Sequence, residues 1–407
     1  PRCRRRRSRG GRAIAKVIVV GGGPAGLACA AELAGRGIGC TIIERREALG
    51  GRAQELACKG SVHCRQCDVC RAHRLRDQVL ASEAVTVLTG VELEQVERCN
   101  GRYRFALRRP TEAIDGGRCS RCGKCVEACP TGAMAKRGGR IRLDRGLCRS
   151  LQGLECERCV SVCPVGAIDL FGEEHLSVSG GAVVVATGAR EFPPAADPRL
   201  GWGLVPGVIS SMQLEAHLEG RSPIALGPKG RVAFVLCVGS RTSKAGTQMC
   251  SAVCCKYSLR QALALRERAP ALGITMFIMD WRGLDGEDAL LRELEGSGIQ
   301  VVRARPAEVV EEEGRPAVRY AGDGTVRCEA FDVVILSIGL IPALDDGTLT
   351  ELGVPRDELG NLVDQGCGDR GLFLAGSCLG PRDIGRCIED GISAARDAIA
   401  YLEGGDG

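Results

Sequence analysis

Eight cysteines between residues 119 and 163 constrain this chain more than any other feature of its sequence. They form two runs that each end in a Cys-Pro pair, Cys119-x2-Cys122-x2-Cys125-x3-Cys129 and Cys148-x7-Cys156-x2-Cys159-x3-Cys163. Thiolates at such spacings are typical ligands of [4Fe–4S] clusters, whereas zinc ribbons have neither the three-residue gaps nor the Cys-Pro endings. The segment is therefore predicted to hold two [4Fe–4S] clusters.

The two runs follow the pattern of two-cluster ferredoxins, in which the fourth cysteine of each run ligates the other cluster. Crossing predicts two ligand sets, namely Cys119, Cys122, Cys125 and Cys163 for one cluster and Cys148, Cys156, Cys159 and Cys129 for its partner. Residues 116–172 are rich in Cys, Gly and Arg and have little apolar periodicity. We predict that they are a ferredoxin insert in a larger α/β domain.

A Gly-rich turn near the start of the chain indicates a dinucleotide site. The motif Gly21-Gly22-Gly23-Pro24-Ala25-Gly26 lies between a predicted strand (16–20) and a predicted helix that reaches about residue 36. Such glycines allow a tight turn and a close approach of backbone N–H groups to a pyrophosphate at the helix N-terminus. Glu44 lies 21 residues beyond Gly23, where an acid holds ribose hydroxyls.

Further motifs resemble the FAD domain of the two-dinucleotide-fold flavoprotein reductases: Gly50-Gly51-Arg52, Ala186-Thr187-Gly188 and the stretch 371–377. In that family the last motif ends in an Asp that contacts the flavin's ribityl chain, and Ser377 replaces it here. We expect the backbone of Ala375 and Gly376 to serve instead. The resemblance implies these FAD contacts: Gly21, Gly23, Pro24, Ala25, Gly26, Glu44, Arg45, Gly51, Arg52, Thr187, Gly188, Gly376 and Ser377.

A second α/β unit follows, with a predicted strand at 231–237 that is not followed by G-x-G-x-x-G. Without those glycines a pyrophosphate has no tight turn, so we predict that this unit does not bind NAD(P)H. The predicted division is a disordered basic tail (1–13), an FAD-binding Rossmann-like domain in three parts (14–115, 173–228 and 331–407), the ferredoxin insert (116–172) and a degenerate Rossmann-like domain (229–330).

A third group of cysteines, Cys237-x12-Cys250-x3-Cys254-Cys255, lies in the second unit. Spacing alone leaves two equal alternatives, a metal site and buried structural thiols. The stretches CVGSR (237–241), CSAVCCKYSLRQA (250–262), MDWRG (279–283) and LGGRAQEL (49–56) resemble the A-type subunit of heterodisulfide reductase, and the similarity extends from about residue 14 to 400. The resemblance implies a third [4Fe–4S] cluster on these four cysteines, beside the flavin.

The same resemblance draws attention to two departures. Where the family offers a Lys to the flavin, this chain has Arg260, which we take as the candidate catalytic residue. Larger members also carry iron–sulfur modules that this chain lacks, so its electron route is shorter or is completed by partners. The run Cys64-x2-Cys67-x2-Cys70 remains open between a further cluster, a redox disulfide and structural thiols.

Composition excludes other classes of function. With 24 Cys but only 4 His, the chemistry is expected to run through sulfur. Without a signal peptide, the abundant cysteine indicates a reducing cytoplasm.

The net charge of +5 comes from seven Arg in the first 12 residues, so we predict no nucleic-acid binding. No apolar stretch reaches the length of a membrane span. Because the sequence starts at Pro1, a fragment or a mis-assigned start is expected.

Together these features predict an electron-transfer oxidoreductase subunit that converts two-electron flavin chemistry into one-electron transfer through iron–sulfur clusters. The alternatives are a self-contained flavin-dependent disulfide reductase and a non-catalytic electron-carrying scaffold. The resemblance implies other subunits of a heterodisulfide reductase-like complex, a hydrogenase or dehydrogenase donor and ferredoxin as partners, with a homodimer within the complex. Only the resemblance implies electron bifurcation.

Overall fold

The computed structural model describes residues 17–60, 64–284, 286–343 and 351–404, so the predicted tail over 1–13 lies outside the described residues. Five short parallel strands form the first sheet in the order β20-β9-β1-β2-β3. Their bounds are Leu372–Leu374, Ala182–Val185, Val17–Val20, Cys40–Ile43 and Val85–Leu88. The strands β1, β2 and β9 are buried along their whole length, as expected for a parallel sheet that is covered on both faces.

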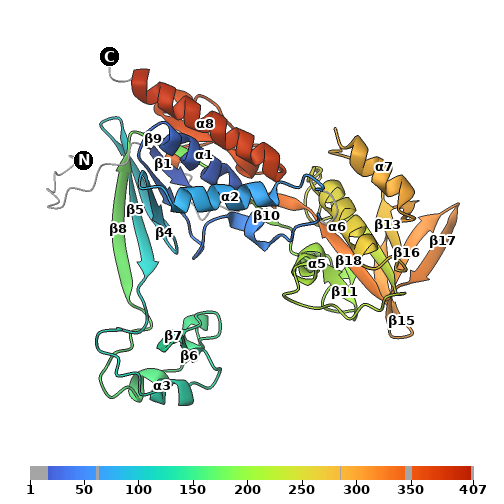
Figure 1. Ribbon diagram of the computed structural model, residues 1–407, viewed down its shortest axis with the longest axis horizontal. Coiled ribbons are helices and arrows are strands. Elements are labelled where there is room, and N and C mark those ends of the chain that lie inside the picture. The colour runs from blue at the N-terminus through green and yellow to red at the C-terminus, as the bar shows by residue number, and fades with distance from the viewer. Residues whose placement is uncertain (1–16, 61–63, 285, 344–350, 405–407) are drawn as a thin grey trace.

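The two faces of this sheet have different covers (Figure 1). The helices α1 (Pro24–Gly35), α2 (Val69–Leu80) and α8 (Ile384–Gly404) lie on one face, where Val17 and Val19 point into their core. On the other face, the alternate residues Ile18 and Val20 pack under an antiparallel sheet. That sheet consists of β4 (Glu92–Cys99), β5 (Arg102–Pro110) and β8 (Glu173–Gly180).

The ferredoxin-like insert connects β5 to β8 and projects away from both sheets (Figure 1). It contains a β6–β7 hairpin (Met134–Arg137 and Arg140–Leu143) and two single-turn helices, α3 (Lys124–Glu127) and α4 (Arg158–Ser161). Its small core includes Met134, Ile141 and Leu170 together with cysteines of both runs. The insert is thus held together largely around its cysteines.

The second unit has its own five-stranded parallel sheet, in the order β11-β18-β12-β13-β14. The strands span Val208–Ser210, Val333–Ile338, Arg231–Val238, Gly273–Ile278 and Gln300–Arg303. One face is covered by α5 (Ser211–Leu218), α6 (Cys254–Arg268) and α7 (Asp288–Gly296). The other face is covered by an antiparallel sheet of β15 (Glu308–Glu312), β16 (Arg315–Gly322) and β17 (Thr325–Ala330).

The sheet order corrects the sequence-based division at two places. We assigned residues 331–407 and 173–228 to the FAD domain, but β18 and β11 pair with each other in the second sheet. The reason is physical: β18 is a continuous buried apolar run, and such a run carries no information about which of two parallel sheets it joins. The chain therefore returns to the first domain only after β18.

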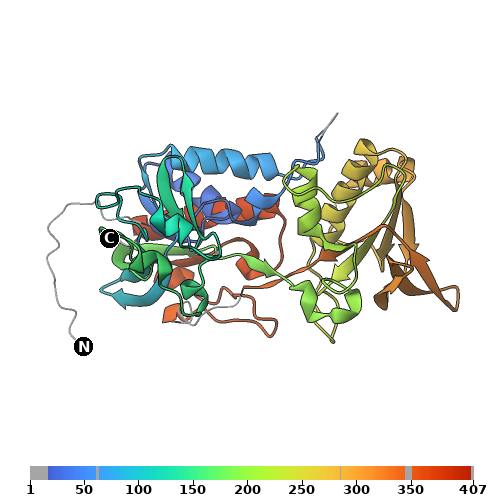
Figure 2. The same ribbon diagram turned by 90° about the horizontal axis from the view of Figure 1, so that it is seen from below.

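Two antiparallel segments, β10 (Ala189–Glu191) and β19 (Leu340–Pro342), carry the chain between the units. Figure 2 shows these crossings side by side between the two sheets. Short 3-10 turns complete the described elements, at Gly51–Glu55, Ser150–Gln152, Pro194–Ala196, Pro198–Leu200, Gly368–Arg370 and Gly376–Leu379. No described helix is long and apolar enough to cross a membrane.

Candidate functional site: an interdomain cavity and three groups of cysteines

The Gly-rich turn between β1 and α1 has the close packing that a dinucleotide-binding turn needs. Gly21 has a φ of +106°, and a Cβ on it would lie 2.3 Å from the carbonyl oxygen of Ala186. A Cβ on Gly26 would lie 1.9 Å from the oxygen of Gly21. Gly23 has no atom within 4 Å of such a Cβ and precedes Pro24 at the start of α1. The turn therefore presents open backbone at the N-terminus of a 12-residue helix.

Glu44 follows β2 and closes the other side of this turn. Its carboxylate accepts hydrogen bonds from the backbone N–H of Gly22 (2.7 Å) and from that of Arg46 (2.8 Å). The side chain is buried but lines the cavity beside the turn. Because each carboxylate oxygen has a second lone pair, Glu44 is fixed in orientation and can still accept hydrogen bonds from ribose hydroxyls.

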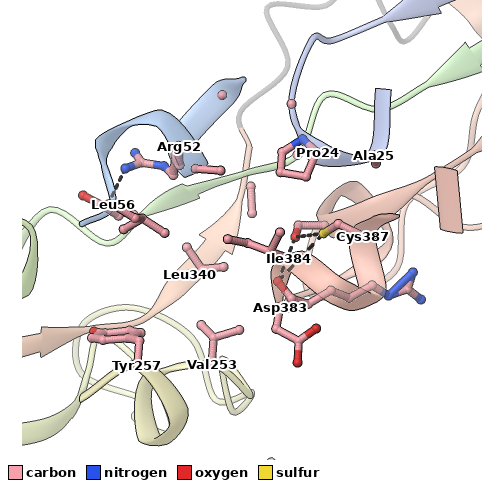
Figure 3. Close-up of a pocket in the computed structure, with 18 of the residues that line it drawn as sticks. Pro24, Ala25, Arg52, Leu56, Val253, Tyr257, Leu340, Asp383, Ile384 and Cys387 are labelled. Atoms are coloured by element: carbon pink, nitrogen blue, oxygen red, sulfur yellow. Dashed lines mark hydrogen bonds and ion pairs between the residues drawn. The ribbon is translucent and has the colours of Figure 1, made fainter. Parts of the chain in front are cut away.

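A cavity of about 290 Å³ extends from this turn to the second unit. In Figure 3, Pro24, Ala25 and Arg52 border one side, whereas Val253 and Tyr257 border the opposite side. Among the predicted residues, these line the cavity: Gly21, Gly23, Pro24, Ala25, Glu44, Arg45, Gly51, Arg52, Thr187, Gly188, Arg260 and Ser377. The tight glycines and the bordering carboxylate fit a dinucleotide.

Gly26 and Gly376 do not line the cavity. Gly26 lies beneath the turn, where only a hydrogen fits, and supports Gly21 from below. The N–H of Gly376 donates to Asp390 (3.2 Å), and that of Ala375 donates to Val185 in the sheet (3.0 Å). Both donors that we expected to replace the missing Asp at position 377 are therefore already used within the protein.

Ser377 itself is held by its neighbours. Its hydroxyl lies 3.3 Å from the carbonyl oxygen of Arg382 and 3.3 Å from the thiol sulfur of Cys387. Burial raises the pKa of the Cys387 thiol, so this thiol is a neutral partner at neutral pH. Ser377 and Cys387 thus form a small polar edge of the cavity.

Apart from Arg260, sequence reasoning missed the side chains that the second unit contributes, above all Lys256 and Tyr257 of α6. Lys256 Nζ lies 2.9 Å from Asp383 and 3.4 Å from Glu287. Burial acts to lower the pKa of Lys256, but the two carboxylates outweigh it and the pKa is raised. Lys256 directly follows the paired cysteines, and its position one helical turn before Arg260 was the available signal.

Arg260 lines the cavity, but its guanidinium is engaged elsewhere. Nε donates to the carbonyl oxygen of Arg65 (2.7 Å), and Nη2 donates to that of Gln66 (3.1 Å) and to Glu287 (2.8 Å). The side chain is buried. Arg260 therefore acts on the loop at 65–66 in this structure, and its predicted catalytic role stays a prediction.

A buried ion pair joins the two units at the edge of the cavity. Lys59 Nζ lies 2.6 Å from Glu215 Oε2, and the side chains are only 3% and 1% exposed. Glu215 also accepts hydrogen bonds from the N–H of Ala57 (2.8 Å) and from Gln261 (2.6 Å). The pair links the first unit to α5 and α6 of the second.

We expect Lys59→Met to lower the free energy of unfolding by about 3–5 kcal/mol, because it leaves a buried carboxylate without its cation. Arg118→Met is the matched control, since its pair with Asp115 is 69% and 47% exposed and such pairs contribute about 0–1 kcal/mol. Denaturant midpoints of the two variants measure the difference. Equal shifts in both would contradict the buried-pair argument.

The insert brings its eight cysteines together as two crossed sets. One small cavity is lined by Cys119, Cys122, Cys125 and Cys163, and the other by Cys129, Cys148, Cys156 and Cys159. The pKa of Cys125 is raised by burial and by the charges of the other three thiols of its set. The pKa of Cys159 is likewise raised by burial and by Cys148 and Cys129.

Backbone N–H groups point at several of these sulfurs. The N–H of Met134 donates to Cys129 Sγ (3.5 Å), and that of Ala167 donates to Cys163 Sγ (3.3 Å). A hydrogen bond from the backbone of Lys124 lowers the pKa of Cys122. Such donors stabilise thiolates. Each cavity therefore fits a [4Fe–4S] cluster by donor type, donor number and hydrogen bonding.

The third group of cysteines lies beside residues that line the interdomain cavity, Val253 and Lys256. Cys237 lies near the end of β12 with a φ of +61°, and Cys254 and Cys255 begin α6. Contact with the thiols of Cys237 and Cys255 holds the pKa of Cys254 well below its usual range, while the pKa values of Cys237 and Cys255 are raised. Cys254 is thus in contact with both of the other two thiols.

Cys250 is the fourth cysteine of this group and is less closely associated with the other three. It is half-buried, its sulfur accepts a hydrogen bond from the N–H of Ala252 (3.4 Å), and its charge acts on Cys237. The neighbouring Val253 lines the interdomain cavity. In the described parts of the chain, no three Cys, His, Asp or Glu side chains are arranged for a single metal ion. In a four-iron cluster each thiolate binds a different iron, so its ligands need not meet at one point.

The loop after β12 lacks the form of a second dinucleotide turn. The strand ends at Val238 and α6 begins only at Cys254, whereas a dinucleotide-binding turn leads directly into its helix. Gly239 packs so closely on Phe192 that a Cβ would lie 2.1 Å from the ring. This long connection carries Cys250 instead of phosphate-binding glycines.

Two segments of the chain match models of known protein families. Residues 19–76 match the model of an NAD(P)-binding Rossmann-like domain, and residues 118–167 match that of a 4Fe-4S dicluster domain. The A-type subunit of H2:CoB-CoM heterodisulfide,ferredoxin reductase from Methanothermobacter marburgensis is 29% identical in an alignment of 425 positions that covers 96% of this chain. The chain is similar to A-type subunits of heterodisulfide reductases.

Another relative is the A-type subunit of ferredoxin:CoB-CoM heterodisulfide reductase from Methanosarcina acetivorans, which is 26% identical and is matched by 95% of this chain. The chain spans 64% of the length of the M. marburgensis protein and 57% of that of the M. acetivorans protein.

Solved structures confirm the predicted fold. The chain of thioredoxin reductase from T. acidophilum aligns over 98% of its length with 96% of this chain, at a TM-score of 0.56 and 15% identity. The Lactococcus lactis enzyme gives a TM-score of 0.53. Two Rossmann-like units of the flavoprotein disulfide reductase type, with a dicluster insert, are thus the architecture of this chain.

Proposed function

We propose that this chain is an electron-transfer oxidoreductase subunit that holds FAD in the interdomain cavity and [4Fe–4S] clusters on its cysteines. Bound FAD exchanges electrons in pairs or singly, whereas each cluster passes one at a time, so together they convert between the two modes. The observation that carries the proposal is the pair of crossed cysteine sets in the insert. A thioredoxin reductase fold alone implies no such one-electron route.

The residues of the first unit bind and orient the cofactor. The open backbone around Gly23 and the N-terminus of α1 receive the pyrophosphate, and Glu44 receives ribose hydroxyls. From the second unit, Lys256 presents a cation whose position is fixed by Asp383. Tyr257 donates to the carbonyl oxygen of Ile338 (2.7 Å), and burial raises its pKa well above the usual value, so it remains a neutral wall of the cavity.

The third group of cysteines is suited to receive electrons from a cofactor bound in the cavity. Cys250, Cys254 and Cys255 flank Val253 and Lys256, both of which line the cavity wall. We propose that these cysteines and Cys237 hold a third [4Fe–4S] cluster, which places a one-electron carrier beside the cofactor.

Partner subunits are part of the proposal, because the insert has the surface of a docking module. Among the described residues, ten large apolar side chains are exposed, and six of them lie in the insert: Leu147, Leu154, Val160, Val162, Val165 and Phe171. Exposed apolar side chains gathered on one small module are typical of a surface that contacts other proteins. The relatives are subunits of complexes, so a multi-subunit complex with a hydrogenase or dehydrogenase donor and ferredoxin is the proposed setting.

Anaerobic purification with iron, sulfide and flavin analysis tests this function. We expect about one FAD and at least about 12 Fe per chain, because three clusters contain four irons each. Subunits that co-purify identify the partners. About 8 Fe per chain would remove the third cluster, and a chain without flavin or without iron in the insert would overturn the proposed function.

A further inference from the structure

The run Cys64-x2-Cys67-x2-Cys70 is not used by any of the sites above, although it borders the cavity. Cys67 is half-buried and lines the cavity, and Cys64 and Cys70 are exposed. None of the three forms a disulfide. The segment leads into α2, in which Cys70 is the second residue.

The backbone of this run repeats that of the first cluster-binding run of the insert. In both runs the residue before the second cysteine is left-handed, with φ +47° at Gln66 and +57° at Arg121. The residue after the second cysteine is also left-handed, with φ +58° at Asp68 and +84° at Gly123. In both runs a helix then begins one residue before the third cysteine.

This agreement is informative because left-handed backbone is unfavourable for residues such as Gln and Arg. Residues persist in such conformations where the surroundings determine them, and they cluster at functional sites. At Cys64 the conformation turns the N–H of Gln66 toward the sulfur, at 3.4 Å. The same kind of N–H to sulfur bond occurs at Cys129 and Cys163 in the insert.

Side chains of the second unit hold this backbone in place. Arg260 donates to the carbonyl oxygens of Arg65 and Gln66, between the first two cysteines. Arg65 in turn pairs with Glu293 (2.6 Å) and Glu267 (2.8 Å), and its own side chain is only 3% exposed. A buried arginine network thus fixes the loop whose conformation matches that of a cluster-binding run.

We propose that Cys64, Cys67 and Cys70 are three ligands of a further [4Fe–4S] cluster, beside the interdomain cavity. In the insert the corresponding run also supplies three thiolates, and its fourth ligand, Cys163, comes from a distant part of the chain. Three thiolates from one run are therefore sufficient for three irons, and the fourth iron takes a ligand from outside the run. In this arrangement Arg260 is a positioning residue of the cluster loop.

The test uses the full chain, reconstituted anaerobically with ferrous iron and sulfide. Cys64→Ser and Cys70→Ser are each expected to lose about four Fe and four sulfides per chain, with FAD content unchanged, because neither side chain lines the cavity. Cys64 is exposed, so its substitution does not disturb the core. Cys58→Ser is the matched control, because Cys58 is an exposed cysteine of the same region outside the run, and it is expected to keep all iron.

Three outcomes would overturn the proposal: wild-type iron in both variants, equal iron loss in Cys58→Ser, or a disulfide between two of the three cysteines in the anaerobic wild-type chain. Cys125→Ala separates this proposal from the proposed function, since it removes a ligand of the insert only. Iron loss in Cys125→Ala without loss in Cys64→Ser would reject the further cluster and leave the function standing.

Discussion

Gly21→Ala is expected to remove at least about 90% of the bound FAD. This corresponds to a loss of about 1.4 kcal/mol or more of the free energy of FAD binding. The glycine has a φ of +106°, which a residue with a Cβ adopts only with strain. In addition, the new Cβ would lie 2.3 Å from the carbonyl oxygen of Ala186, at the end of the neighbouring strand β9. The turn must therefore move away from β9, and the pyrophosphate site moves with it.

Two other glycines of the same region give graded controls for this variant. Gly23→Ala has space for its Cβ and a φ of −76°, so we expect the fold to be retained while the Cβ intrudes on the cavity and weakens FAD binding. Gly35→Ala, near the end of α1, meets no atom within 4 Å and is expected to leave flavin content and stability unchanged or improved. Flavin absorbance per chain and thermal unfolding measure all three. Full flavin in Gly21→Ala would refute the assignment of this turn.

The parts of the site that are local in sequence could be predicted from the residues alone. The turn at 21–26 and Glu44 belong to one strand–helix–strand unit, so their spacing fixes their positions. Tyr257 and Lys59 could not be found in this way, and the only local signal for Lys256 was its position one helical turn before Arg260. Their place at the cavity depends on how the second unit packs against the first, and no local pattern encodes that packing.

The same contrast between local sequence and long-range packing explains the contacts that Arg260 and Ser377 make. The family pattern pointed to their positions, and both line the cavity. Their partners come from elsewhere, however: Arg260 is engaged by the loop at 65–66, and the backbone beside Ser377 is engaged by Asp390 of α8. A motif can locate a residue at a cavity, but the partners of its polar atoms are set by long-range contacts.

We predict that cluster ligation in the insert is crossed, and paired substitutions test this prediction. If the sets are crossed, Cys125→Ala with Cys163→Ala removes two ligands of the same cluster and costs about four Fe per chain. Cys125→Ala with Cys129→Ala removes one ligand from each cluster and costs up to about eight Fe. Uncrossed ligation, in which each run holds its own cluster, predicts the reverse order.

The contrast between the two double variants is robust because both replace two thiols by two methyl groups in the same small core. Any general loosening of the insert lowers the iron content of both, whereas the ligand sets determine which one loses more. Cys129 and Cys163 are matched in exposure and in the N–H bond that each sulfur accepts. A larger iron loss from the Cys125/Cys163 pair than from the Cys125/Cys129 pair would therefore show that each run binds its own cluster, and would refute the crossing.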